Sequence, residues 1–334
     1  MSRSRSTTSI SDEKLRALVT ERTLAQPALD MSPYIDRIVG IYGEKILGIF
    51  MYGSMLSEVT KSTTSFPDFF VVTDGYRKVF RKLSHRILAY PLPPHIFHLR
   101  LSDTDRCKYN LLALRRFQRE TSKRAMDVYI FGRFGKRVSL LYSRDKKAQK
   151  DLIDCCHSAM RTVALWSARG MGYEPFDEKQ FTLACLNLSY AGETRVEATS
   201  KVPKLFASEQ NFYMQMYPAL LRELSETTHW VRRRTDGCYE LYGNSSARWL
   251  RSKRFQWFLK QSRTRGILRW PKFLVTVDEW VDIILAKIER TKGIKLDPTP
   301  RARRHPLIFG WPYLFRLIRA KAIGSSKTIP EKDS

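Results

Sequence analysis

The chain has 334 residues, with 59 Lys and Arg against 33 Asp and Glu, so its formal charge is +26. Apolar residues make up 43% of the chain and aromatic residues 12%, a composition typical of a folded core and not of a disordered basic tail. No stretch approaches the ~20 consecutive apolar residues of a membrane-spanning helix, which argues against an integral membrane protein. The charge predicts an anionic partner: a nucleic acid, an acidic membrane surface or a phosphorylated substrate.

The length suggests about two domains, and the pattern along the chain changes three times. Residues 1–32 are polar and lack the apolar segment of a secretion signal, so we expect a mobile N-terminal tail. Mixed strand and helix patterns predict one domain over 33–148. Helical patterns predict a second, mainly helical domain over 149–290, with a winged-helix-like arrangement as one option, and a basic amphipathic tail over 291–334. The predicted fold class is therefore α/β (α+β), with a mixed sheet and helices.

In the first domain, hydrophobic spacing and turn residues set the order of the expected elements. A helical pattern covers 31–45, and two apolar runs that end in turns, 46–53 and 66–75, predict buried strands. A basic amphipathic helix is expected over 76–90. Further strands are expected over 95–101, 127–131 and 137–142.

The second half of the chain combines helical patterns with a high density of basic residues. Residues 248–272 contain nine Lys and Arg and no acidic residue, with tryptophans between them. A separate basic and aromatic stretch, 301–321, follows Pro300. Both stretches suit an anionic surface. Helices are expected over 151–170, 178–192, 211–224 and 277–290.

The feature richest in chemistry is the turn Gly53-Ser54 followed by Asp68 on the next predicted strand. Glycine lets the backbone approach a phosphate closely, and serine offers a hydroxyl and an N–H to anionic oxygens. A strand carboxylate can then hold Mg²⁺ against a triphosphate. The arrangement is similar to that of nucleotidyltransferases of the DNA polymerase β type. The alternative is a plain turn and strand, because Phe70 occupies the usual place of a second carboxylate.

Several later segments resemble one family when they are taken together. The segments, in chain order, are YGSM (52–55), KYNLL (108–112), YIFGRFGKRV (129–138), LSYAGETR (188–195) and Lys201-Val202. Their order and gaps are similar to those of the mitochondrial-type CTP:phosphatidate cytidylyltransferases, the translocator assembly and maintenance family. Four departures mark a divergent member: Met55 and Asn110 in place of glycine, Glu193 in place of aspartate, and no aspartate in the stretch 113–116 that follows KYNLL.

The resemblance implies Mg²⁺-dependent cytidylyl transfer from CTP to phosphatidic acid, which gives CDP-diacylglycerol and pyrophosphate for phospholipid biosynthesis. It implies that Asp68 binds the metal and that Tyr52, Gly53, Ser54 and Glu193 hold the nucleotide, with Glu193 either a second metal ligand or a partner that orients Arg195. Lys108, Arg195 and Lys201 would join Asp68 as catalytic residues by contacting the triphosphate or the lipid phosphate. The alternative for each cation is a solvated surface charge.

A lipid substrate also implies a peripheral enzyme on the inner face of a membrane, either the bacterial cytoplasmic membrane or the matrix side of the mitochondrial inner membrane. The basic stretches 248–272 and 301–321 would then contact the anionic bilayer, unless the tail packs on the protein's own core. Two other classes stay open: a nucleotidyltransferase that acts on RNA or another nucleic acid, and a catalytically inactive binder of lipid or nucleic acid.

Overall fold

The computed structural model describes residues 5–56, 66–80, 83–102, 105–192, 201–276, 297–304 and 312–313. The chain divides into two compact units, Met1–Lys272 and Phe273–Ser334. The residues of the predicted 33–148 domain therefore share one unit with most of the predicted helical domain. In the second unit, α13 (Pro300–Arg304) is a described helix, and both the predicted helix over 277–290 and most of the basic tail lie outside the described residues.

The first unit is built on a five-stranded mixed sheet, which confirms the predicted fold class. The strands are β1 (Ile46–Tyr52), β2 (Asp68–Thr73), β3 (His95–Arg100), β4 (Arg106–Ala113) and β5 (Val138–Ser143). Their order is β3-β4-β2-β1-β5, and among the pairs of neighbouring strands in this sheet only β2 and β4 are paired in parallel. Every residue of β1 is buried, as its continuous apolar run predicts for a central strand.

Helices cover both faces of the sheet. On one face, α2 (Ser32–Tyr42) packs through Tyr34 on Phe69 of β2. On the other face, Phe50 of β1 contacts Phe117 of α5 (Leu114–Thr121) and Phe134 of α6 (Phe131–Phe134). These aromatic contacts anchor the apolar core beneath the edge where β1 ends and β2 begins.

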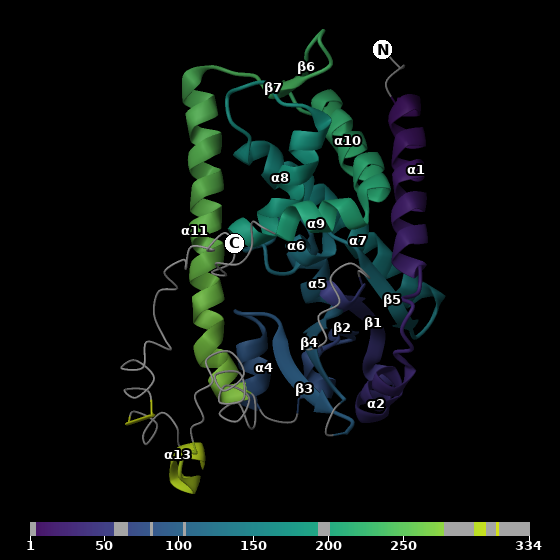
Figure 1. Ribbon diagram of the computed structural model, residues 1–334, viewed down its shortest axis with the longest axis vertical. Coiled ribbons are helices and arrows are strands. Elements are labelled where there is room, and N and C mark those ends of the chain that lie inside the picture. The colour runs from purple at the N-terminus through teal and green to yellow at the C-terminus, as the bar shows by residue number, and fades with distance from the viewer. Residues whose placement is uncertain are drawn as a thin grey trace, which may run out of the picture. The chain divides into compact units, whose positions relative to one another are not determined.

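Longer helices gather above the sheet in the view of Figure 1. The central helix is α7 (Lys146–Gly170), whose N-cap Asp145 accepts a hydrogen bond from the Ala148 N–H at 2.7 Å. Asp177 and Gln180 form a capping box at the start of α8 (Glu178–Ala191). The helices predicted over 151–170, 178–192 and 211–224 are confirmed by α7, α8 and α10 (Gln210–Thr227). Two further helices, α9 (Lys201–Ser208) and α11 (Ser245–Thr276), were not predicted individually. A short hairpin, β6 (Val231–Arg233) and β7 (Tyr239–Leu241), lies between α10 and α11.

The N-terminal segment differs from its prediction, because a packed helix, α1 (Arg5–Leu24), stands where we expected a mobile tail. Leu15 and Val19 of α1 are buried in the core. Arg16 reaches Asp154 of α7 at 2.6 Å. The apolar stripe is short and its ionic partners are distant in sequence, so the local pattern alone does not reveal the helix.

Two other segments also differ from their predictions. Residues 127–131, expected to be a strand, form a turn that leads into α6, because the Asp127 carboxylate accepts a hydrogen bond from the Tyr129 N–H at 3.0 Å. The expected helix over 76–90 is present as two short helices, α3 (Tyr76–Val79) and α4 (Leu83–Ala89). Among the described residues, no helix is long and apolar enough to cross a membrane.

Candidate functional site

Three neighbouring strands bring the predicted site residues to one edge of the sheet. Tyr52 at the end of β1 is paired with Asp68 at the start of β2, and Asp68 is paired in turn with Lys108 of β4. The Lys108 Nζ lies 3.9 Å from the Asp68 Oδ1. The side chain of Asp68 is 36% exposed and that of Lys108 is 27% exposed, so both can meet a ligand at this edge. The site that was predicted from β1, its turn and β2 therefore also includes a cation, Lys108, from a third strand, β4.

Gly53 lies directly against the Asp68 carboxylate. Its φ of 92° falls in the left-handed region that favours glycine, and a Cβ added there would lie 3.5 Å from the Asp68 Oδ2. Ser54 starts a short 3₁₀ turn, η2 (Ser54–Leu56). The Ser54 side chain lies outside the described residues. Because Gly53 has no side chain, the backbone after β1 can come close to a ligand bound at the Asp68 carboxylate.

An ionic pair supports the end of this turn. The Arg137 Nη1 donates to the Leu56 carbonyl at 2.8 Å and contacts the Glu209 Oε1 at 2.7 Å. Glu209 is also paired with Arg22 of α1. Through these contacts the N-terminal helix helps to hold the glycine-serine turn in place.

A buried polar chain lies beside Asp68 on the same sheet. The Asn110 Nδ2 donates to the Tyr52 hydroxyl at 2.6 Å, and the Tyr129 hydroxyl donates to the Asn110 Oδ1 at 3.3 Å. Burial raises the pKa of Tyr52 well above its usual value, and the charge of Asp68 raises it further. The Tyr52 hydroxyl therefore stays protonated, and Asn110, which stands where the family has glycine, has a defined structural partner.

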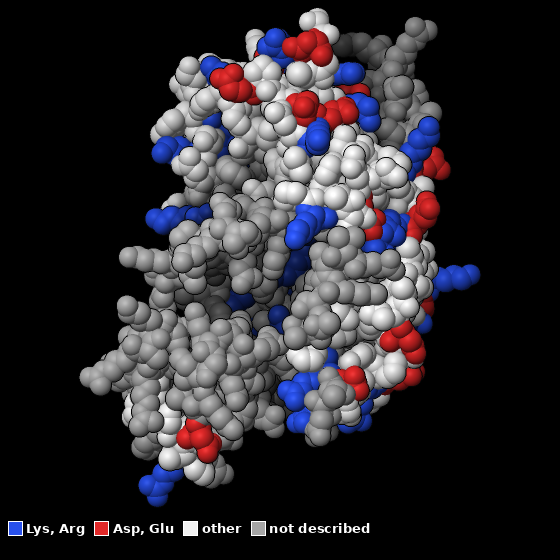
Figure 2. All heavy atoms as spheres, viewed as in Figure 1, with Lys and Arg blue, Asp and Glu red and all other residues white. Residues whose placement is uncertain are grey.

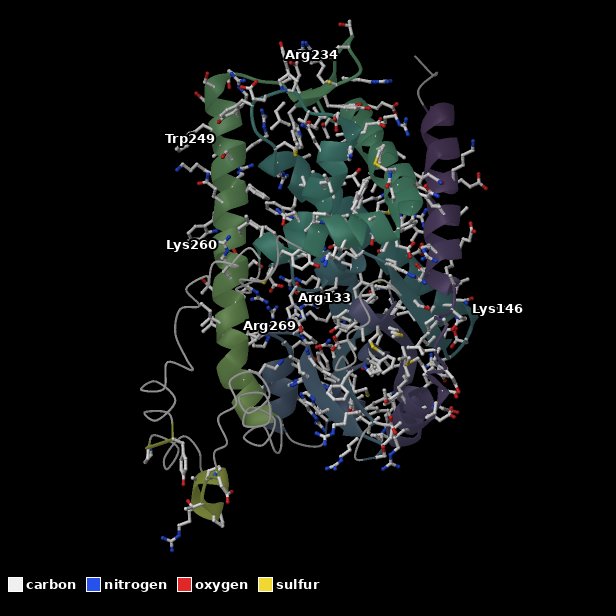
Figure 3. The ribbon with its side chains drawn as sticks, in the orientation of Figure 1. Arg133, Lys146, Arg234, Trp249, Lys260 and Arg269 are labelled. Carbon is white, nitrogen blue, oxygen red and sulfur yellow. The ribbon has the colours of Figure 1, made fainter. Side chains whose placement is uncertain are left out.

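Two further cations, Arg133 and Lys136, come from the segment that follows Tyr129. The Arg133 guanidinium lies 3.8 Å from the centre of the Tyr129 ring and 6.0 Å from that of Tyr52. The Lys136 Nζ lies 3.6 Å from the centre of the Tyr190 ring. Figure 3 shows Arg133 in the interior of the view, between the sheet and the long helices. Arg133 lies on α6 and Lys136 lies two residues beyond its end. Neither was predicted as a site residue, although both lie in YIFGRFGKRV, because the motif does not place their side chains beside Tyr52 or Tyr190.

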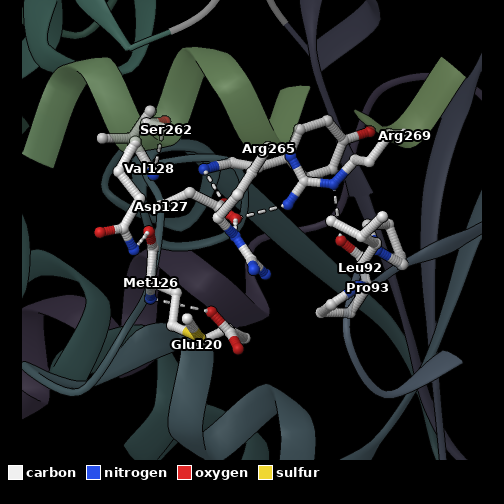
Figure 4. A network of polar contacts seen from close by, with 12 residues as sticks. Leu92, Pro93, Glu120, Met126, Asp127, Val128, Ser262, Arg265 and Arg269 are labelled. Carbon is white, nitrogen blue, oxygen red and sulfur yellow. Dashed lines mark hydrogen bonds and ion pairs between the residues drawn. The ribbon is translucent and has the colours of Figure 1, made fainter. Parts of the chain in front are cut away.

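Helix α11 fixes the Tyr129 segment through a buried ionic network (Figure 4). The Asp127 Oδ2 accepts from the Arg265 Nε at 2.6 Å and from the Arg269 Nη2 at 2.7 Å. Burial alone would raise the pKa of Asp127, but the charges of Arg269 and Arg265 outweigh it and lower the pKa below its usual value. The Arg269 guanidinium also lies 4.5 Å from the centre of the Tyr129 ring. These two arginines, expected to face an anionic partner, are instead counterions of a buried carboxylate.

The same helix holds the end of α8. The Ser262 hydroxyl donates to the Gly192 carbonyl at 2.9 Å, and the Arg263 Nε donates to the Ala191 carbonyl at 3.0 Å. Beyond Gly192, the predicted site residues Glu193 and Arg195 lie outside the described residues, as does the side chain of Lys201. The structure thus brings together Tyr52, Gly53, Asp68 and Lys108, and the other predicted roles stay predictions.

Comparison with known proteins supports the family resemblance. Residues 99–257 match the family described as phosphatidate cytidylyltransferase, mitochondrial. Over these residues the chain resembles that family. The match confirms the resemblance inferred from the motifs and the predicted enzyme class, a nucleotidyltransferase. It includes Lys108, Tyr129 and Arg133, whereas Gly53 and Asp68 lie before it.

Other comparisons add little about the site. No curated protein matches the chain. Among solved structures, a nucleotidyltransferase-like protein from Exiguobacterium sibiricum 255-15 is 13% identical over 87% of this chain and 92% of that chain, with a TM-score of 0.25.

Proposed function

We propose that the chain is a peripheral membrane enzyme that transfers a cytidylyl group from CTP to phosphatidic acid, giving CDP-diacylglycerol and pyrophosphate for phospholipid biosynthesis. The observation that carries the proposal is the edge where Gly53, Asp68 and Lys108 meet. The family match over residues 99–257 supplies the substrate class. A glycine turn, a strand carboxylate and a cation are the groups that a triphosphate needs in one place.

The proposed reaction needs positioning and charge neutralisation more than covalent catalysis. A phosphate oxygen of phosphatidic acid forms a bond to the α-phosphorus of CTP, and the bond from that phosphorus to the bridging oxygen breaks as pyrophosphate leaves. A phosphate monoester is already a good nucleophile at neutral pH, so no side-chain base is required. Lys108 and Arg133 are the described cations that we expect to neutralise the phosphates, because both lie beside the Tyr52–Asp68 pair.

Asp68 is the residue that we propose as a ligand of Mg²⁺. Its carboxylate is partly exposed and only 3.9 Å from one ammonium group, so it retains oxygen lone pairs for a cation. Mg²⁺ at nucleotide sites is commonly held by one or two carboxylates together with substrate phosphates and water, which suits this edge. When bound, the metal would neutralise charge on the triphosphate. Glu193, which follows the described end of α8, is the second ligand that we propose.

The remaining predicted residues complete the proposal. Tyr52 supports the carboxylate edge from β1, Ser54 would donate to the nucleotide phosphates, and Arg195 and Lys201 would contact the triphosphate or the lipid phosphate. The basic tail over 301–321 would hold the enzyme on the inner face of a bacterial cytoplasmic or mitochondrial inner membrane.

The test is to incubate the full-length protein with α-labelled CTP, Mg²⁺ and phosphatidic acid in detergent micelles, and in parallel with RNA and DNA oligonucleotides. We expect the label in CDP-diacylglycerol, and its loss when a chelator removes the metal. Label in the oligonucleotides would instead support a nucleic-acid-directed enzyme. Absence of any labelled product would support a binder without catalytic activity.

A further inference from the structure

We propose that the outward face of α11 binds the surface of an anionic lipid bilayer. The face is defined by a single line of residues: Trp249, Lys253, Trp257, Lys260, Thr264 and Leu268. The inference rests on the proposed function in one respect, because it assigns the surface through which the enzyme would reach a lipid substrate. It is separate from the predicted role of the tail, since α11 up to residue 272 belongs to the first compact unit.

The line follows the helical repeat along most of α11. Its spacings of three and four residues place all six side chains on one face, over about 28 Å of helix. Trp249 is 56% exposed, Trp257 is 67% exposed and Leu268 is 50% exposed. Figure 3 shows Trp249 and Lys260 pointing away from the body of the unit. Large apolar side chains repeated on one exposed face suggest a surface that is covered when the protein works.

The opposite face of α11 already packs on the protein, so the outer tryptophans are not needed to hold the helix. Phe258 is 5% exposed and stacks on Trp166 with ring centres 3.8 Å apart. Between the two faces lies a hollow of about 620 Å³, lined mainly by apolar residues that include Met126, Trp249 and Trp257, with Lys253 among them. This hollow gives an apolar group of a lipid a place to enter beside the line.

The charge of α11 selects an anionic occupant. The helix has no acidic residue over Ser245–Thr276. Figure 2 shows acidic side chains mainly at the top and right of the visible face, whereas basic side chains also occur on the left, along α11. Lysines beside exposed tryptophans match the interface of an anionic bilayer, where the ammonium groups meet headgroups and the indole rings lie at the boundary.

Other occupants fit the surface less well. A second copy of α11, or the basic stretch 301–321 of the chain itself, would bring positive charge against positive charge. A nucleic acid would use the two tryptophans for stacking, but the aliphatic side chains of Leu250, Ile267 and Leu268, all at least 45% exposed, provide no stacking surface. A bilayer can contact all three kinds of exposed side chain on α11: its apolar interior accepts the aliphatic side chains, its interface accepts the tryptophans, and its anionic headgroups pair with the lysines.

The experiment measures sedimentation of the full-length protein with vesicles of phosphatidylcholine mixed with phosphatidylglycerol, and with phosphatidylcholine alone. We expect Trp249→Ala/Trp257→Ala and Lys253→Glu/Lys260→Glu each to weaken binding to the anionic vesicles by about tenfold or more. The matched control is Lys146→Glu/Lys147→Glu, which changes the net charge equally at two exposed residues. Lys146 lies on the side away from Trp249 in Figure 3. This control should bind within about threefold of the unaltered protein.

A conservative variant separates loss of the surface from loss of the fold. Trp249→Phe/Trp257→Phe should keep binding while it reduces the blue shift of tryptophan emission on vesicle addition. The proposal is overturned if the alanine variant binds the anionic vesicles as well as the unaltered protein does, or if the Lys146/Lys147 control loses as much binding as the α11 variants. Binding of the same proteins to an oligonucleotide is measured in parallel. If the α11 variants lose binding to the oligonucleotide but not to the vesicles, the proposal is also overturned. Cytidylyl transfer to a short-chain, monomeric phosphatidate is measured separately: its absence in the unaltered protein contradicts the proposed function and leaves the vesicle result valid.

Discussion

Replacing Asp127 by Asn removes the carboxylate on which two arginines of α11 converge. Asp127 is 2% exposed, and the side chains of Arg265 and Arg269 are 12% and 9% exposed, so water cannot solvate the charges that remain. Removal of one partner from a buried ion pair commonly destabilises a protein by about 3–5 kcal/mol. Here the arginines keep hydrogen bonds to the carbonyls of Pro91 and Pro93, both at 2.8 Å. We therefore expect the lower end of that range, about 3 kcal/mol.

Thermal unfolding measures the effect directly. For a unit of this size, about 3 kcal/mol corresponds to a fall in Tm of roughly 6–12 °C. The matched control is Asp74→Asn, because Asp74 pairs with Arg144 at 3.1 Å but its side chain is 35% exposed, and exposed pairs contribute ~0–1 kcal/mol. The variant Asp127→Asn/Arg269→Gln should be less destabilised than the sum of its single changes, because it removes one uncompensated charge.

The reasoning fails if Asp127→Asn lowers Tm no more than Asp74→Asn does, or if the double variant is simply additive. Either result would mean that water or other groups compensate the arginines without the carboxylate. Because Tyr129 and Arg133 follow the Asp127 turn directly, we also expect Asp127→Asn to reduce cytidylyl transfer below the temperature at which the variant unfolds.

Three further predictions concern the site and a buried histidine of α7. Gly53→Ala should reduce cytidylyl transfer and lower the free energy of unfolding in urea by about 1–2 kcal/mol. The added Cβ makes only ordinary contacts, but the φ of 92° is unfavourable for alanine. Unchanged stability would show that the backbone can relax from this conformation. Lys108→Met should raise KM for CTP about tenfold or more with little change in Tm, and an unaltered KM would remove Lys108 from the nucleotide site. Burial, with the charges of Arg161 and Arg16, lowers the pKa of His157 to about 4. The unfolded chain therefore binds a proton below pH ~6.5 that the folded chain does not, and stability should fall by about 1.4 kcal/mol per pH unit from there toward pH 4. His157→Gln should flatten this decline, and an equal slope in both proteins would contradict the assignment.

The parts of the fold that the sequence predicts are those with strong local patterns. The run 46–53 is apolar throughout because β1 is a central strand with both faces covered, and its Gly53-Ser54 end is visible as a turn. Asp68 is recognisable because a carboxylate at the start of the next apolar run has an obvious chemical use. The family motifs add Lys108 as a candidate, but only the pairing of β2 with β4 places it beside Asp68.

The parts that could not be predicted depend on contacts between distant residues. The aromatic run 127–131 has the composition of a strand, yet the Asp127 side chain closes a turn there and α11 holds that turn in place. Arg265 and Arg269 belong to a stretch whose charge suggests an anionic partner, and their internal counterion lies more than a hundred residues earlier in the chain. Helix α1 is likewise stabilised by partners on α7 that the local pattern does not indicate.

The most direct test of the central claim compares Asp68→Asn with Asp74→Asn in cytidylyl transfer from labelled CTP to phosphatidic acid. Asp68 begins β2 and Asp74 directly follows its last residue, and their side chains are 36% and 35% exposed, so the substitutions are closely matched. We predict that Asp68→Asn lowers kcat by about a hundredfold or more with Tm nearly unchanged, whereas Asp74→Asn keeps its activity. Full activity of Asp68→Asn, or an equal loss in both variants, would contradict the assignment of this edge as the active site.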